Sequence, residues 1–235
     1  IAGNVSTTDG GTITQTYADS TRPTVTSFTS STEDGSYNLG DAINITATVS
    51  EEVVAGSVIT AVLGTGDQIN LTASAKGYNL EAVYTVGSGD NSSDLKVSSF
   101  SSTATDIYGN SMTSTVVPVG GNLSDNKALV VDTIDLAIKN AIADNVIDKD
   151  GNSSISIGDQ VSLEFYESVG KITGSDSLDQ ALAAILGDGG ANVRWETDNK
   201  SVTFDVTTTT QDSYSGSFED LAGNTATLTF TLDII

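Results

Sequence analysis

Two matching acidic motifs contain the residues of this sequence that are best suited to chemistry. Asp106-Ile-Tyr-Gly-Asn110 and Asp220-Leu-Ala-Gly-Asn224 carry Asp, Gly and Asn at the same spacing. Carboxylate and amide oxygens are typical calcium ligands. The same residues are also typical of a plain turn, in which Asp accepts hydrogen bonds from backbone N–H groups. Both interpretations, a calcium loop and a turn, are open at this point.

Two glutamates occupy an unusual place in the hydrophobic pattern. Apolar residues alternate along residues 43–49 and 161–165, which is typical of strands with one face in a core. The same parity places Glu51 and Glu167 on the apolar face, one step past the last core residue. A carboxylate at the edge of a core needs a metal ion or several N–H donors. Both glutamates are therefore candidate ligands.

The order of these motifs predicts two calcium sites, one in each half of the chain. In a β-sandwich the start of the first strand, the end of the second and the loop before the last strand lie at one pole. Carboxylates 4 Å apart repel by about 1 kcal/mol in water and about 4 kcal/mol at an effective dielectric of 20, so such a group favours a cation. The expected ligands are Asp19, Glu51, Asp106 and Asn110 in the first half, and Asp132, Asp135, Glu167, Asp220 and Asn224 in the second.

Residues 148–159 form a further candidate calcium loop. Their spacing resembles a twelve-residue loop with oxygen ligands at alternate positions, although the glycine stands at position 4 and not at position 6. The alternative is a solvated hairpin turn. The expected ligands are Asp148, Asp150, Asn152 and Asp159.

The motifs recur because the sequence repeats. Leu39-Gly-Asp41 matches Ile157-Gly-Asp159, and an alternating segment follows each of them. We expect one module over residues 19–131 and a second over 132–235. Residues 1–18 are then the closing strands of a preceding module, or a strand donated to a neighbour. We expect the chain to be a piece of a longer array; the alternative is a short subunit whose open ends dock onto neighbours.

The pattern of short alternating segments predicts an all-β fold of tandem immunoglobulin-like β-sandwiches. Residues 176–186 are the exception, because helix formers follow an early acidic turn and end at Gly187. We interpret this helix as a cover for an open edge of the sandwich, and the alternative is a binding insertion. Expected strands include residues 42–50, 69–75, 80–86, 95–100 and 111–119 in the first module, and 135–141, 160–166, 193–197, 201–207, 214–218 and 225–232 in the second.

Composition excludes several classes of function. The formal charge is −22, from 31 acidic and 9 basic residues, which disfavours binding to nucleic acid or anionic lipid. The chain has no Cys and no His, so thiolate or imidazole metal sites and nucleophiles are excluded. No apolar run reaches the length of about 20 residues that spans a membrane. Trp195 is the one tryptophan, and few aromatic residues are available for a sugar cleft, so we expect no enzyme.

The order of the motifs resembles a known family. A Pro23-Thr-Val segment precedes an Asp-Gly turn, a Gly-Asp pair, a strand that ends in Ser-Glu or Glu-Ser, and Asp-x-x-Gly-Asn. This order is similar to the bacterial Ig-like repeats of giant secreted adhesins and of prokaryotic surface-layer (S-layer) proteins. The resemblance covers nearly the whole chain and is weakest at residues 171–194. It implies a β-sandwich, a cell-surface location, a stalk or lattice role and frequent calcium binding.

Three functions follow as expectations. The first is a non-enzymatic, extracellular structural segment whose modules stack end to end and are stiffened by calcium. The second is a subunit of a filament or surface lattice that is joined by strand addition. The third is a ligand-binding adhesin module that recognises glycan or protein. Glycan is also a candidate modification, because seven Asn-x-Ser/Thr sequons occur, at Asn4, Asn44, Asn70, Asn91, Asn122, Asn152 and Asn199.

Overall fold

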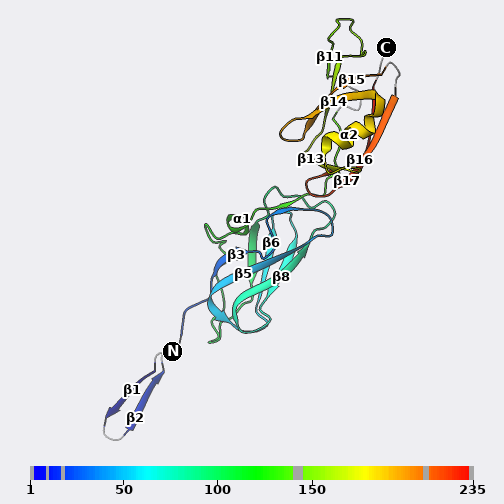
Figure 1. The fold of residues 1–235 in the computed structure, drawn as a ribbon. Coiled ribbons are helices and arrows are strands. Elements are labelled where there is room, and N and C mark those ends of the chain that lie inside the picture. The colour runs from blue at the N-terminus through cyan, green and yellow to red at the C-terminus, as the bar shows by residue number, and fades with distance from the viewer. Residues whose placement is uncertain (1–2, 9–10, 17–18, 140–144, 209–211, 233–235) are drawn as a thin grey trace. The chain divides into compact units, whose positions relative to one another are not determined.

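The computed structural model describes residues 3–8, 11–16, 19–139, 145–208 and 212–232 (Figure 1). The chain divides into two compact units, and both are built mainly of β-strands, as the sequence predicts. The first unit comprises Ile1–Gly35 and Leu39–Val131, and the second comprises Ser36–Asn38 and Asp132–Ile235.

Near its start the chain forms a hairpin with a sheet of its own. Strands β1 (Gly3–Thr8) and β2 (Gly11–Thr16) pair antiparallel in register from Gly3 with Thr16 to Thr8 with Gly11. Within the described residues, neither strand pairs with any other strand. These two strands therefore lie outside the six-stranded sheet of the first unit. That they close a preceding module or are donated to a neighbour stays a prediction.

Six strands of the first unit form one antiparallel sheet, in the order β3-β5-β8-β7-β6-β9. The alternating residues of β5 place Ile43, Ile45, Ala47 and Val49 in the core, as predicted. Outside this sheet, the short strands β4 (Gly35–Tyr37) and β10 (Leu129–Val131) form a two-stranded sheet, and α1 (Leu123–Asn126) is a single turn. The sheet contains β3 (Val25–Thr29), β5 (Ala42–Val53), β6 (Val58–Leu63), β7 (Gln68–Thr72), β8 (Gly77–Thr85) and β9 (Val97–Ser102).

Two predictions for the first unit need correction. The sequence analysis omitted β6, although residues 58–63 are a nearly continuous apolar run. It also expected a strand over residues 111–119, where the structure has only an isolated bridge between Thr105 and Ser111. Pro118 lies in this segment, and proline has no N–H to donate to a ladder. The side chain of Val116 is 71% exposed, whereas Met112 is buried, so the segment packs in the core near its start and not further along.

The second unit contains two sheets. One has the order β11-β12-β15-β14, and the other has the order β13-β16-β17. No strand covers residues 135–139; a single bridge joins Ile138 to Phe165, and the rest of the strand expected at 135–141 lies outside the described residues. The strands are β11 (Asn145–Ile147), β12 (Gln160–Glu164), β13 (Val169–Ile172), β14 (Gly190–Trp195), β15 (Ser201–Val206), β16 (Asp212–Asp220) and β17 (Thr225–Leu232).

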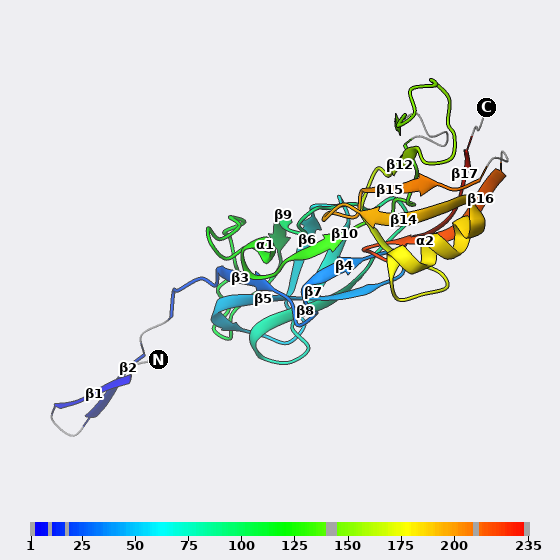
Figure 2. The ribbon, with the colours of Figure 1, turned by 45° about the horizontal axis from the view of Figure 1, so that its top comes forward.

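The predicted helix is present as α2 (Leu178–Leu186), which the 3-10 turn η1 (Gly187–Gly189) follows (Figure 2). It contacts β14 of one sheet and β13 and β16 of the other, so it lies across one open side of the unit. Two of the helix's own residues, Leu182 and Leu186, are buried. A Cβ atom at Gly190 would clash with Leu186, and one at Gly216 would clash with Ile185. These two glycines allow the helix to approach both sheets.

The two units share one strand order. The first four strands of the larger sheet, β3-β5-β8-β7, match β11-β12-β15-β14, and β6-β9 match β13-β16. In the first unit β6 and β7 pair directly, which joins the two groups into one sheet. In the second unit α2 and η1 occupy the corresponding connection between β13 and β14, and the two groups stay separate sheets.

Aromatic rings fill the core of the second unit. Phe165 stacks on Trp195 with ring centroids 5.6 Å apart and lies 5.8 Å from the ring of Phe218. Trp195 is partly buried against this cluster, so its expected role in packing is confirmed. The same residue is the only tryptophan of the chain and therefore reports on the second unit alone.

Candidate metal centres

The first Asp-x-x-Gly-Asn motif folds as a turn around a buried carboxylate. Oδ1 of Asp106 accepts hydrogen bonds from the backbone N–H groups of Tyr108 (2.8 Å) and Asn110 (2.7 Å). Oδ2 accepts one from the side-chain amide of Asn110 (2.8 Å). Gly109 supplies the positive φ of 94° that the turn requires. Burial disfavours the ionised form of Asp106, but these hydrogen bonds outweigh it and hold the pKa of this carboxyl below its ordinary value.

The second motif repeats this arrangement. Oδ1 of Asp220 accepts from the N–H groups of Ala222 (2.7 Å) and Asn224 (3.0 Å), and Oδ2 accepts from the Asn224 amide (2.8 Å). Gly223 again has a positive φ, of 92°. The turn interpretation of both motifs is therefore correct. It leaves the calcium interpretation open, because Oδ2 of each aspartate accepts a single hydrogen bond here and has a further lone pair.

Each turn also binds the first residue of its predicted module. The amide of Asn110 donates to the backbone carbonyl of Asp19 (3.2 Å), and that of Asn224 donates to the backbone carbonyl of Asp132 (3.0 Å). The two partners are separated by 91 residues in one case and 92 in the other. This clasp was not predicted from the sequence, although the similar spacing was visible in the repeat.

Three carboxylates converge beside the second turn. Atoms of Asp132, Glu167 and Asp220 lie within 4.8 Å of one another, and we call these residues the Glu167 cluster. Asp220 is buried, whereas Asp132 and Glu167 are partly exposed. Glu167 reaches the cluster because it continues the inward parity of β12 beyond Phe165. Of the two expected aspartates at the start of this unit, Asp132 joins the cluster and Asp135 is exposed outside it.

The Glu167 cluster carries unbalanced negative charge. Burial raises the pKa of Glu167 to about 7, and the charges of Asp132 and Asp220 act in the same direction. Lys200 opposes this rise in pKa only weakly. A cation is the natural counterpart of three such oxygens, and hard oxygen ligands suit calcium, which takes six to eight of them. The three residues could therefore hold a metal ion.

The corresponding residues of the first unit are arranged differently. Among the described residues, Asp19, Glu51 and Asp106 form no comparable cluster of carboxylates. Oδ1 of Asp19 instead accepts from the N–H of Thr21 (2.9 Å). The neighbour of Glu51, Glu52, forms an ion pair with Lys76 (2.9 Å). A lysine side chain thus provides positive charge at this pole of the first unit.

A small hollow lies at the same place. It has a volume of about 110 Å³ and contains Glu51 and Asp106 in its wall together with two half-exposed tyrosines, Tyr78 and Tyr108. Glu51 is partly buried, as its parity predicts.

The 148–159 loop brings together a second group of carboxylates. Atoms of Asp148, Asp150 and Asp159 lie within 4.8 Å of one another, and the Asn152 amide donates to Asp150 (2.8 Å). All four residues that the spacing predicted therefore lie in one loop. Asp159 is buried, whereas Asp150 is exposed.

Backbone N–H groups already donate hydrogen bonds to carboxylates of this loop. Asp148 accepts from the N–H of Ser153 (2.7 Å), and Asp159 accepts from the N–H groups of Lys149 and Ser156 (2.8 Å each). These bonds hold the pKa of Asp148 and of Asp159 below the ordinary range. Compared with the Glu167 cluster, this loop needs a cation less, because N–H groups stabilise its charges.

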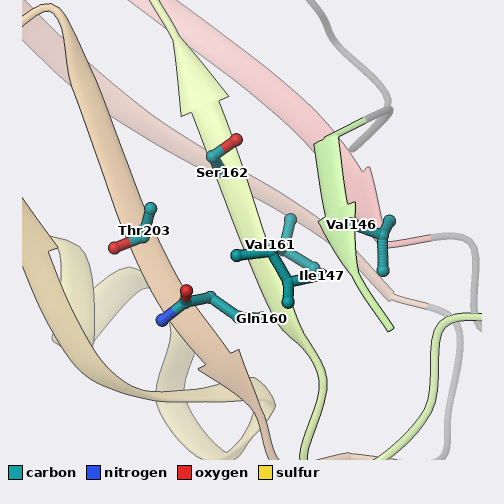
Figure 3. A pocket seen from close by; sticks show the side chains of 6 residues that line it. All are labelled: Val146, Ile147, Gln160, Val161, Ser162 and Thr203. Atoms are coloured by element: carbon teal, nitrogen blue, oxygen red, sulfur yellow. The ribbon is translucent and has the colours of Figure 1, made fainter. Parts of the chain in front are cut away.

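A larger hollow on the second unit has no acidic residue in its wall. It has a volume of about 290 Å³ and is formed by β11, β12 and β15 (Figure 3). The wall combines apolar side chains with one amide and two hydroxyl groups, from Val146, Ile147, Gln160, Val161, Ser162 and Thr203. This hollow is therefore separate from both acidic clusters and is not suited to a cation.

No protein-family model matches the chain, and no curated protein matches it. Within the described residues, no helix is long and apolar enough to cross a membrane.

Proposed function

We propose that this chain is a non-enzymatic structural segment of an extracellular, cell-surface protein, in which immunoglobulin-like modules stack end to end and calcium stiffens them. The strand pairing of the second unit supports the immunoglobulin-like part of the proposal. Numbered along the chain, β11 to β17 pair as first-second-fifth-fourth and third-sixth-seventh. This is the pairing of the two sheets of a constant-type immunoglobulin sandwich.

The repeated order supports the tandem part. The first unit has the same pairing for its first six strands, and each unit closes with an Asp-x-x-Gly-Asn turn that binds the carbonyl of a residue at the start of a module. In an array of repeats, the same contact between the turn and the first residue is expected in each successive module.

The Glu167 cluster is the observation that carries the calcium part. Asp132 follows Val131, the last residue of the first unit. Its carboxylate lies close to those of Glu167, which follows β12, and Asp220, the last residue of β16. A calcium ion at these oxygens would hold the linker to two strands of the second unit. The ion supplies positive charge and coordination; the protein residues supply the oxygens and fix the start of the module.

The test combines thermal melting with small-angle X-ray scattering, each with calcium and with chelator. If the dissociation constant is about 10 μM and calcium is about 1 mM, binding stabilises the folded state by about 2.7 kcal/mol. We expect a higher melting temperature and a narrower distribution of interdomain distances in calcium. Glu167→Gln should remove both effects, and Glu51→Gln is the matched control. Unchanged melting and unchanged scattering would refute calcium stiffening.

A second candidate function is a filament or lattice subunit joined by strand addition. The β1–β2 hairpin favours it, because its strands pair only with each other in the part of the chain that is described. An isolated two-stranded hairpin is marginally stable in water, so a partner sheet would stabilise it. Concentration-dependent polymers that disappear on Ile13→Lys in β2 would support this function, and a chain that stays monomeric would refute it.

A further inference from the structure

The second unit has one long strand at the edge of a sheet. Its two sheets end in β11, β14, β13 and β17. Strand β17 spans eight residues, and over the described residues it pairs with β16 alone. The free side of an edge strand presents unpaired N–H and C=O groups to any other strand.

The other three edges have features that hinder such pairing. Strand β11 has three residues, which is too short for a stable ladder. Strand β13 has four residues, a register shift and the charged Lys171. Strand β14 has a register shift and the charged Arg194, and α2 packs against it. Short length, bulges, charges and a covering helix are the usual protections of sheet edges.

Strand β17 has none of these protections. Its sequence is Thr-Ala-Thr-Leu-Thr-Phe-Thr-Leu, without a charge, a proline or a register shift. Although the whole chain has a formal charge of −22, pairing two copies of this strand sets no like charges directly opposite each other. Its threonines alternate with apolar residues that face the core, where Phe230 and Leu232 are buried and Ala226 and Leu228 are partly exposed.

We propose that β17 is an interaction surface for a second copy of this chain, whose own β17 pairs with it antiparallel about a two-fold axis. The strand is self-complementary, because an antiparallel pair of alternating strands sets threonine beside threonine on one face and apolar residues beside apolar residues on the other. Two-fold pairing is also the commonest symmetry of soluble oligomers. The product is a continuous six-stranded sheet, β13-β16-β17 followed by the same three strands of the partner in reverse order.

This contact joins modules side by side, and it goes beyond the proposed end-to-end stacking. Stacked modules that also pair laterally would form bundles or a lattice. The contact uses no residue of the Glu167 cluster, so it is independent of calcium.

Sedimentation equilibrium over a concentration series tests the proposal, in calcium and again in chelator. We expect a monomer–dimer equilibrium with the same dissociation constant in both buffers. Thr227→Lys places a charge on the exposed face of β17 and should weaken dimerisation at least tenfold. Thr72→Lys is the matched control, because Thr72 is an exposed threonine of β7, an interior strand of the first unit, and it should leave the dimer unchanged. Trp195 fluorescence confirms that the second unit of Thr227→Lys is folded, and far-UV circular dichroism confirms that the first unit of Thr72→Lys is folded.

Single cysteines give a second measurement. Because the chain has no cysteine, Thr227→Cys and Thr229→Cys can form a disulfide only between copies. These positions lie near the middle of β17, so we expect crosslinked dimers on oxidation, and none from Thr72→Cys. A chain that is monomeric at millimolar concentration would overturn the proposal. So would a dimer that tolerates Thr227→Lys, or one that is lost on Ile13→Lys in β2, which would assign the contact to the hairpin. None of these results would affect the calcium experiment.

Discussion

Replacement of Asn224 by alanine tests the clasp that closes the second unit. The Asn224 amide donates to Oδ2 of Asp220 (2.8 Å) and to the backbone carbonyl of Asp132 (3.0 Å). Asn224 and Asp220 are only 8% and 4% exposed, so water cannot easily replace the lost donor. A buried acceptor left without its donor costs about 1–3 kcal/mol, and more when it is charged. We therefore expect Asn224→Ala to lower the free energy of unfolding of the second unit by about 2–3 kcal/mol.

Urea unfolding followed by Trp195 fluorescence measures this loss. With a denaturant slope of about 1–3 kcal/mol per M, the midpoint should fall by about 1–2 M. Asn110→Ala removes the equivalent clasp of the first unit, where Asp106 is 1% exposed. That variant should lower the urea midpoint of the first unit, measured by far-UV circular dichroism. It should leave the midpoint measured by Trp195 fluorescence unchanged.

Asn70→Ala is the surface control for Asn110→Ala, because Asn70 is exposed on β7 of the first unit and should change stability by less than about 0.5 kcal/mol. Ser215→Ala is the surface control for Asn224→Ala, because Ser215 is exposed on β16 of the second unit. If Asn224→Ala shifts the Trp195 midpoint no more than Ser215→Ala does, the clasp contributes nothing measurable. The structural equivalence of the two turns would then carry no energetic meaning.

Three further predictions concern other parts of the structure. The pKa of Glu167 is raised from 4.5 to about 7, so in chelator its contribution to the stability of the second unit is fully present below pH 4.5 and is lost as pH rises through about 7. After solvent screening we expect this loss to be on the order of 1 kcal/mol in pH-dependent urea unfolding. The Glu167→Gln variant should not show it. Gly216→Ala should destabilise the second unit by about 1–3 kcal/mol, because its Cβ would displace Ile185 of α2, whereas exposed Ser215→Ala should have little effect on the same Trp195 transition. Gly109→Ala should cost the first unit about 1–3 kcal/mol through strain at a φ of 94°, and an equal stability of Gly109→Ala and wild type by circular dichroism would contradict the assigned turn.

The hydrophobic pattern predicted those parts of the structure that depend on neighbours in sequence. Alternation placed Glu167 on the inward face of its strand, and the structure has it beside Asp132 and Asp220. Helix formers followed by Gly187 predicted α2 within a few residues. In both cases the information lies within about ten residues, where strand parity and helix propensity act directly.

Features that depend on distant residues were not predictable in this way. The first unit has the same parity at Glu51, yet Lys76, from the connection before β8, pairs with Glu52 there. No local pattern indicates that a lysine 24 residues away will supply this charge. The missed strand β6 is a short apolar run, which is as typical of a buried helix segment as of a buried strand. The strand expected at 111–119 contains Pro118, which was visible in the sequence and argues against a strand there.

Isothermal titration calorimetry with calcium tests the central claim most directly. The wild-type chain should bind calcium, and Glu167→Gln should lose a binding site that Glu51→Gln retains, because among the described residues only the second unit brings three carboxylates together at its start. The same site should remain when Asp150→Asn weakens the 148–159 loop. No binding at millimolar calcium, or identical isotherms for the wild type and Glu167→Gln, would contradict a calcium-stiffened segment.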